Sequence, residues 1–176
     1  MIKNLPPRPD DQSTTLQRAP RADEIGTREH WGTTTSVIRV GHLFFADELS
    51  KDALLLAKQR GIERVIDLRG PDEIAAAALN EKHEVEGLGM QYVNTPVVSG
   101  KPFDRAEFAA VSAKVGNGPT LIHCHSGNRV AAWYAAHLVG HANLKVEQAI
   151  EIANRVGLTK DKAREMLRKL LASGAK

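Results

Sequence analysis

Apolar residues along the chain alternate between short runs typical of buried strands and longer stretches with helical spacing. The short runs are rich in β-branched residues and predict strands at 37–40, 43–45, 65–68, 90–95 and 120–123. The longer stretches predict helices starting near residues 51, 71, 104, 128, 146 and 160. Because strands and helices alternate, we expect an α/β fold with a central, mostly parallel sheet of four to five strands and helices on both faces.

Capping residues support several of these helix boundaries. Ser50 is a good N-cap for the first helix, and Gly61 is placed to end it. Pro71 suits the first turn of the second helix. Asp104 has capping-box spacing to Glu107, which predicts the start of a helix running to about residue 115. We expect the next helix to run from about 128 to 139, with Gly140 after it, and Thr159 to cap the last helix.

The first 32 residues lack any apolar period. Four of the eight prolines fall within the first twenty residues, among Arg, Asp, Gln, Ser and Thr. We therefore predict that residues 1–32 form an extended or disordered tail. The remaining residues, 33–176, have the length of one domain.

Composition and charge are those of a water-soluble globular protein. Hydrophobic residues make up 42% of the chain, and no apolar run approaches the roughly 20 residues that a spanning helix needs. The first residues contain no signal-peptide core, so a cytoplasmic location is expected, or a periplasmic one if a signal peptide has been removed. The net charge of +3 suits anionic small substrates but is too small to indicate nucleic-acid binding.

Cys124 is the only cysteine of the chain. A disulfide within the chain and a zinc site of several cysteines are therefore excluded, and we expect no metal or cofactor. A lone cysteine is usually a small buried hydrophobe. Its neighbours decide whether it has a chemical role.

The segment after the predicted strand 120–123 has the composition of an anion-binding loop. It leads directly into a helix, so successive backbone N–H groups and the positive helix end would converge on one point. Gly127 permits the required turn, and Arg129 offers a planar fork for two phosphate or sulfate oxygens. The same field would favour the thiolate of Cys124. We therefore predict a nucleophilic Cys124, a clamping Arg129, and a phosphate-binding loop formed by His125, Ser126, Gly127, Asn128 and Val130.

The run His123-Cys124-His125-Ser126-Gly127-Asn128-Arg129 resembles the signature of the protein tyrosine and dual-specificity phosphatase superfamily. Residues 61–69, Glu73 and residues 89–96 are similar in order and spacing to bacterial members. The similarity is greatest to a phosphatase-like family of unknown function that is also found fused to β-lactamase-like hydrolases. It covers roughly residues 36–140. The resemblance implies a dual-specificity-phosphatase-like fold and hydrolysis of small phosphoesters or protein phosphotyrosine through a phosphocysteine intermediate.

Three departures from the superfamily pattern affect the expected activity. Four residues, not the usual five, separate Cys124 from Arg129, and single-domain rhodaneses share this spacing. Val130 stands where many members carry a hydroxyl that helps the thiolate leave, which predicts slow turnover. The superfamily's acidic Asp would fall near residues 92–94, where the chain has none. Asp104 is the nearest downstream candidate for the general acid, and its alternative role is the helix N-cap with Glu107.

Other polar residues near the predicted loop have alternative structural and functional roles. His123 is expected to anchor the loop, and His125 to line the pocket or point elsewhere. Asp67 and Arg69 would form an ion pair that stabilises the fold or supports the loop. Two other functions stay open: a sulfurtransferase with a persulfide on Cys124, and a non-catalytic phosphate- or sulfate-binding module.

Overall fold

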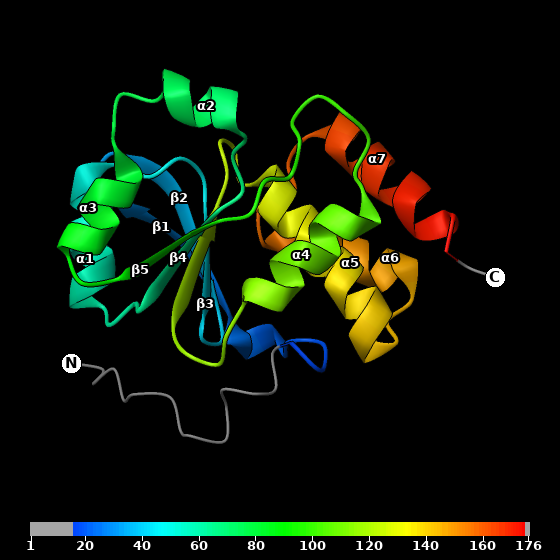
Figure 1. Cartoon of the computed structure of the whole chain (residues 1–176). Coiled ribbons are helices and arrows are strands. Elements are labelled where there is room, and N and C mark those ends of the chain that lie inside the picture. The colour runs from blue at the N-terminus through cyan, green and yellow to red at the C-terminus, as the bar shows by residue number, and fades with distance from the viewer. Residues whose placement is uncertain (1–15, 175–176) are drawn as a thin grey trace.

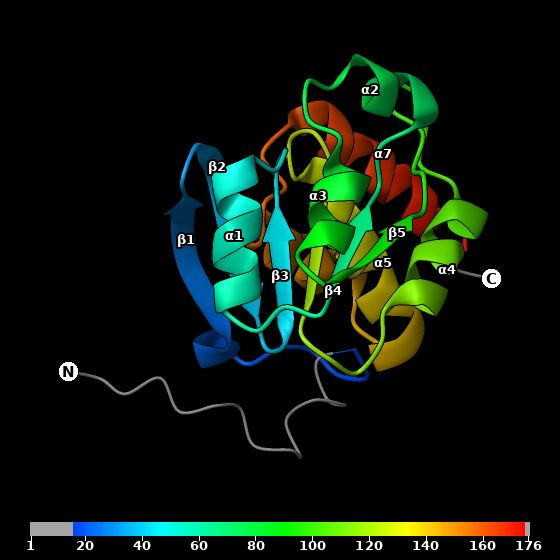
Figure 2. The same cartoon turned by 60° about the vertical axis from the view of Figure 1, so that its left-hand side comes forward.

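A computed structural model of the chain describes residues 16–174 and contains one mixed sheet of six strands. The strands are β1 (Ile25–Trp31), β2 (Thr34–Val40), β3 (Leu43–Ala46), β4 (Arg64–Asp67), β5 (Gln91–Asn94) and β6 (Thr120–His123). Their spatial order is β1-β2-β3-β6-β4-β5 (Figures 1 and 2). Strands β3, β6, β4 and β5 run parallel to one another. Strand β2 pairs antiparallel with both β1 and β3. The predicted α/β class and mostly parallel sheet are confirmed, but the sheet has six strands and not four to five.

Strand β1 lies in a segment that the sequence assigned to the tail, so the predicted boundary between residues 32 and 33 cuts a hairpin. Its sequence, IGTREHW, has apolar residues only at its two ends. It is held at the sheet edge by backbone pairing with β2, which requires no apolar alternation. Trp31 is fully buried and packs against Phe44 with ring centroids 5.6 Å apart. Residues 16–24 of the predicted tail are also described and include a single 3-10 turn at Ala22–Glu24, whereas residues 1–15 lie outside the described residues.

Seven α-helices of the described part surround this sheet. They are α1 (Lys51–Gln59), α2 (Pro71–Ala76), α3 (Glu81–Gly87), α4 (Arg105–Lys114), α5 (Asn128–Ala142), α6 (Val146–Arg155) and α7 (Asp161–Ala172). Helices α1 and α3 cover one face and α4 to α7 the other (Figure 1). Each face has its own buried cluster, one including Leu54 and Val85 and the other including Phe45 and Trp133. The expectation of helices on both faces is confirmed.

Most helix starts agree with the predicted caps. Two boundaries differ, the end of α5 and the start of α7. The Ser50 hydroxyl accepts a hydrogen bond from the Ala53 N–H at 3.3 Å, as predicted for the N-cap of α1. Helix α5 continues through Gly140 to Ala142, because its packing against α6 and α7 outweighs the small cost of an internal glycine. Helix α7 is capped by Lys160 and not by Thr159.

The parallel strands bring several loops to one edge of the sheet. Asp67 of β4 is in register with His123 of β6 and with Asn94 of β5, and Ala46 of β3 is also in register with His123. The carboxyl ends of four strands are therefore level, which is where ligands bind in such sheets. The Cys124 loop leaves β6 at this edge. Between residues 16 and 174, no helix combines the length and apolarity needed to cross a membrane.

Candidate active site

The Cys124 loop connects a fully buried strand to the longest helix of the described part. Gly127, the N-cap of α5, has φ of +78°, a left-handed conformation that favours glycine. This turn points the Gly127 N–H at the Cys124 sulfur, 3.1 Å away. Cys124 has no exposed surface. The loop therefore folds around the sulfur and directs a backbone dipole at it, as the sequence predicted for an anion nest.

Arg129 lies in the first turn of α5 with its guanidinium turned inward, and its side chain is 9% exposed. Nη1 donates to the backbone carbonyls of Val97 and Leu68 at 2.9 and 3.3 Å. Burial alone would lower the pKa of Arg129, but hydrogen bonds to Glu73 and the nearby Cys124 sulfur raise it. The guanidinium therefore stays charged.

Glu73 of α2 binds Arg129 in a bidentate pair, with Oε1 2.6 Å from Nη2 and Oε2 2.8 Å from Nη1. Burial raises the pKa of Glu73, but the pair with Arg129 lowers it more, so the carboxylate is ionised. Glu73 also accepts a hydrogen bond from the Gly70 N–H, its expected role at a helix start. No local pattern predicts the contact between Glu73 and Arg129, because the two residues are 56 positions apart.

A buried polar network supports the loop from below. His123 Nε2 lies 2.6 Å from Glu81 of α3. Arg69 binds Asp67 at 2.9 Å and Glu81 at 2.7 Å, so the expected Asp67–Arg69 ion pair is present. Burial alone would lower the pKa of His123, but Glu81 and Asp67 raise it. The Tyr92 hydroxyl donates to Asp67 at 2.9 Å.

The same network contains a group of donor atoms with the composition of a metal site. One ligand atom each of Asp67, Glu81 and His123 lies within 4.8 Å of the others. The Arg69 guanidinium already binds both carboxylates, so these residues have an organic cation as their partner. Glu81 was not among the sequence candidates, because nothing near it in the chain indicates a buried partner.

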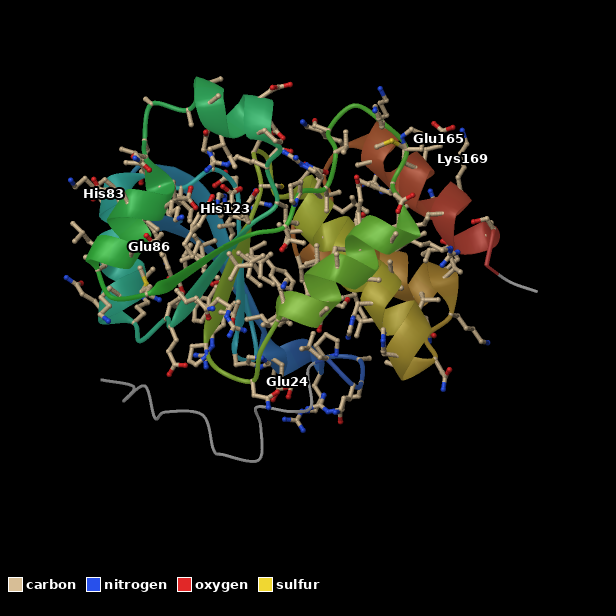
Figure 3. The ribbon with its side chains drawn as sticks, viewed as in Figure 1. Glu24, His83, Glu86, His123, Glu165 and Lys169 are labelled. Atoms are coloured by element: carbon tan, nitrogen blue, oxygen red, sulfur yellow. The ribbon has the colours of Figure 1, made fainter. Side chains whose placement is uncertain are left out.

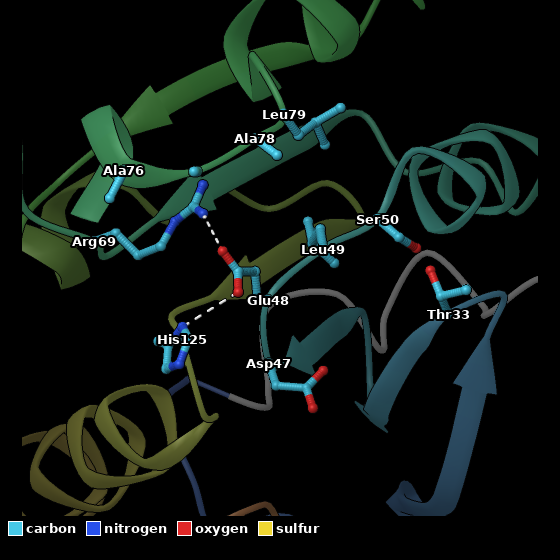
Figure 4. Close-up of a pocket in the computed structure, with 11 residues that line it drawn as sticks. Thr33, Asp47, Glu48, Leu49, Ser50, Arg69, Ala76, Ala78, Leu79 and His125 are labelled. Carbon is cyan, nitrogen blue, oxygen red and sulfur yellow. Dashed lines mark hydrogen bonds and ion pairs between the residues drawn. The ribbon is translucent and has the colours of Figure 1, made fainter.

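Glu48 connects this network to the loop through a wide cavity (Figure 4). Its carboxylate lies 3.1 Å from Arg69 Nη1 and 3.3 Å from His125 Nδ1. The Glu48 N–H also donates to the His125 carbonyl at 3.2 Å. The cavity has a volume of about 550 Å³, and its lining includes Asp47, Ser50 and Leu79. His125 is 67% exposed and stands between this cavity and the next.

The second cavity, of about 200 Å³, lies directly on the predicted loop. His125, Ser126, Asn128 and Arg129 line it, as the sequence predicted. Its other walls come from the segment between β5 and α4 and from the start of α7: Val98, Ser99, Gly100, Lys101, Phe103, Lys160, Lys162, Ala163 and Met166, with Glu73 of α2. Val130 does not line it but is fully buried in the core.

Asp104 is not brought to this cavity. It is exposed, and its Oδ1 accepts hydrogen bonds from the N–H groups of Ala106 and Glu107 at 2.7 and 3.1 Å, which is the N-cap arrangement. The Glu107 carboxylate binds the Val98 N–H instead of completing a capping box. Among the described residues that line the cavity, the carboxyl and imidazole groups belong to Glu73 and His125.

No protein-family model and no curated protein matches the chain. Solved structures do match it. Kinase-associated phosphatase, with its catalytic-site cysteine replaced by serine, is 17% identical with a TM-score of 0.63, over 74% of this chain and 86% of that one. TpbA from P. aeruginosa in complex with phosphotyrosine is 16% identical with a TM-score of 0.59, over 88% and 99%.

A third structure has higher identity. A proposed phosphatase from Shewanella putrefaciens is 24% identical with a TM-score of 0.55, over 86% of this chain and 92% of that one. At these identities, the three similarities establish the fold alone. The chain therefore has the fold of the protein tyrosine and dual-specificity phosphatases, as the resemblance of its loop implied.

Proposed function

We propose that the protein hydrolyses phosphate monoesters with Cys124 as nucleophile and Arg129 as phosphate clamp. The observation that carries the proposal is the Cys124 loop itself: the Gly127 N–H donates to the Cys124 sulfur at 3.1 Å, and the buried Arg129 guanidinium in the first turn of the following helix is held in place by Glu73. Backbone N–H groups at a helix N-terminus and a guanidinium beside them favour a bound oxyanion. The TpbA complex with phosphotyrosine supports an aryl phosphate as one substrate of this fold.

The reaction proceeds in two displacements. The Cys124 thiolate attacks phosphorus, so that the S–P bond forms and the ester P–O bond breaks, and the leaving oxygen takes a proton. Water then attacks phosphorus, releasing orthophosphate and the thiolate as the S–P bond breaks. Loop N–H groups and the Arg129 fork hold the three equatorial oxygens in both steps.

Hydrogen bonds to one carboxylate and two backbone carbonyls prepare Arg129 for this role. The Glu73 carboxylate and the Leu68 and Val97 carbonyls hold the guanidinium in one plane before substrate arrives. Preorganised donors avoid reorganisation during the reaction. Cys124 is fully buried within this loop, and its sulfur accepts a hydrogen bond from the Gly127 N–H.

The described lining of the cavity offers no protonated carboxyl group that could donate a proton to the leaving group. Asp104 caps α4, and Glu73 is held ionised by Arg129. We therefore expect aryl phosphates, which leave readily without an acid, to be better substrates than alkyl phosphates. Missing proton donation typically costs about 10²–10⁴-fold. Val130 in place of a hydroxyl should make release of phosphate from sulfur slow.

The decisive experiment is to trap phosphate on Cys124. Mass spectrometry after acid quenching of a reaction with an aryl phosphate should show the protein plus one phosphoryl group, and Cys124→Ser should abolish both the adduct and turnover. Absence of any adduct and of any turnover in the wild type would refute the proposal. Anion binding alone would then favour the binding-module alternative.

Asp104→Asn tests the remaining acid candidate without disturbing the helix, because Asn caps as well as Asp. We expect turnover of both aryl and alkyl phosphates to be unchanged. A loss confined to alkyl phosphates would instead assign the acid to Asp104.

A sulfurtransferase is the second candidate, favoured by the four-residue spacing between Cys124 and Arg129. It predicts transfer of sulfur from thiosulfate to cyanide with a persulfide on Cys124. Assaying this reaction beside aryl phosphate hydrolysis, on the same preparation, separates the two.

A further inference from the structure

We propose that the 200 Å³ cavity binds phosphotyrosine within an acidic peptide, with Lys101, Lys160 and Lys162 recognising the acidic residues beside it. This inference rests on the proposed function and names its substrate class. It follows from three features of the cavity: an apolar wall, a rim of unpaired lysines, and a hydrogen-bonded connection that fixes part of this rim to the phosphate loop.

The apolar wall suits an aromatic ring. Val98, Phe103 and Met166 line the cavity together with the polar loop, and Val98 is 39% exposed although it is apolar. A ring carrying phosphate at one end would place its oxygens on Arg129 and its carbons on this wall. The volume lies below the roughly 300–1,000 Å³ of sites for drug-sized ligands. The cavity therefore takes one phosphorylated side chain, and the rest of the substrate lies outside it.

The lysines stand where the flanking residues of such a peptide would pass. Lys101 comes from the segment between β5 and α4, and Lys160 and Lys162 come from the start of α7. All three are exposed, and none has an ion-pair partner within residues 16–174. Nearby acids are already paired, Glu73 with Arg129 and Asp161 with Arg164. The rim therefore keeps a positive charge beyond what the phosphate itself uses.

Asn128 connects this rim to the phosphate loop. Its Oδ1 accepts hydrogen bonds from two consecutive N–H groups, those of Thr159 and Lys160, both at 2.9 Å. Its Nδ2 donates to the Thr159 hydroxyl at 3.3 Å and to the Ser126 carbonyl at 3.2 Å. Asn128 is almost completely buried. The backbone of Lys160 is thereby held at a fixed place relative to the residue next to Arg129.

The apolar wall and the lysine rim disfavour a highly charged substrate that has no apolar part. A polyphosphorylated polyol has no apolar surface to cover Val98, Phe103 and Met166. An acidic phosphotyrosine peptide satisfies both the wall and the rim. Exposed ion pairs each contribute little, so we expect the three lysines together to change selectivity by roughly tenfold at low salt.

The test compares two phosphotyrosine peptides that differ only in the residues beside the phosphotyrosine, Glu and Asp in one and Gln and Asn in the other. We expect kcat/KM to be about tenfold higher for the acidic peptide at low salt, with the difference shrinking at 0.5 M salt. A triple variant with Lys101, Lys160 and Lys162 changed to Gln should lose this preference. A control with the remote, exposed lysines Lys58, Lys82 and Lys114 changed to Gln has the same net charge and should keep it.

Other outcomes separate this inference from the proposed function. No hydrolysis of either peptide or of any aryl phosphate contradicts the function itself. Equal hydrolysis of both peptides leaves the function standing and overturns the inference, as does a polyphosphorylated polyol that is hydrolysed faster than the acidic peptide. Binding to Cys124→Ser gives a second measurement without turnover, in which the acidic peptide should bind more tightly.

Discussion

At the scale of single residues, the most informative contact is the bidentate pair between Glu73 and Arg129. A guanidinium buried beside a thiol has many ways to point, and the Glu73 carboxylate together with two backbone carbonyls selects one. Under the proposed function, Glu73 is thus a positioning residue that would act on the phosphate through Arg129. A positioning role predicts that a substitution at Glu73 changes the kinetics more than the stability.

Glu73→Gln should lower kcat/KM for an aryl phosphate by roughly tenfold, because the neutral amide has only one acceptor oxygen, so one of the two charge-assisted bonds to Arg129 is lost and the other is weakened. The Gln oxygen can still accept from the Gly70 N–H, so the start of α2 and the thermal midpoint should change little. Steady-state kinetics and thermal unfolding of the same preparations check this. Asp72→Asn, an exposed neighbour in the same turn, is the control and should behave as the wild type. Unchanged kinetics in Glu73→Gln would contradict the positioning role.

At the scale of elements, the junction of β6 and α5 places the chemistry. Gly127 adopts φ of +78° at this junction, and a Cβ built there would lie 3.9 Å from the Ala46 and Gly157 carbonyl oxygens. Space is therefore available for a methyl group, and only the backbone conformation opposes it. The consequence of a substitution can thus be assigned to conformational strain alone.

Gly127→Ala should destabilise the protein by about 1–2 kcal/mol, the cost of a left-handed conformation for a residue with a Cβ. It should also reduce phosphate hydrolysis, because relief of the strain turns the N–H away from the Cys124 sulfur. Chemical denaturation and an aryl phosphate assay measure the two effects. The matched control is Gly140→Ala in the same helix, where nothing lies within 4 Å and Ala should stabilise by about 0.5–1 kcal/mol. Equal effects of both substitutions would contradict the assignment.

The elements also explain what the sequence could predict. The Cys124 loop was identified because its functional residues are neighbours in the chain, and helix caps such as Ser50 are equally local. Glu48, Glu81 and the contact of Glu73 with Arg129 were missed, because the partners are brought close by the register of parallel strands, which no local pattern encodes. Strand β1 was missed for a related reason. Its place depends on backbone pairing at a sheet edge, and its side chains are mostly polar.

At the scale of the whole molecule, the polar network around His123 connects the sheet to helix α3 beneath the candidate active site. His123 belongs to β6, Asp67 to β4 and Glu81 to α3, and Arg69 follows β4. Figure 3 shows His123 in the interior and His83 on the outer side of α3. The groups that face His123 are Glu81, Asp67 and Arg69, with Tyr92 bound to Asp67. Because burial and these charges act on a single imidazole, the stability of the fold depends on pH.

The direction of this dependence follows from the raised pKa of His123 in the folded protein. An unfolded histidine has a pKa of about 6.5, so the stabilisation from protonated His123 is fully present below that pH and is lost as pH rises through the folded pKa. We therefore expect the urea midpoint to fall as pH increases above about 6.5. Glu81→Gln removes the charge that most raises the His123 pKa, so its midpoint should fall over a lower pH range. It should also destabilise the protein by about 3–5 kcal/mol, since one partner of a buried ionic network is lost. His83→Gln, on the exposed side of the same helix, should leave the pH dependence unchanged. Urea titrations of the three proteins between pH 5.5 and 9.5 measure this, and a wild-type midpoint that rises across this range would show that His123 is neutral in the folded state.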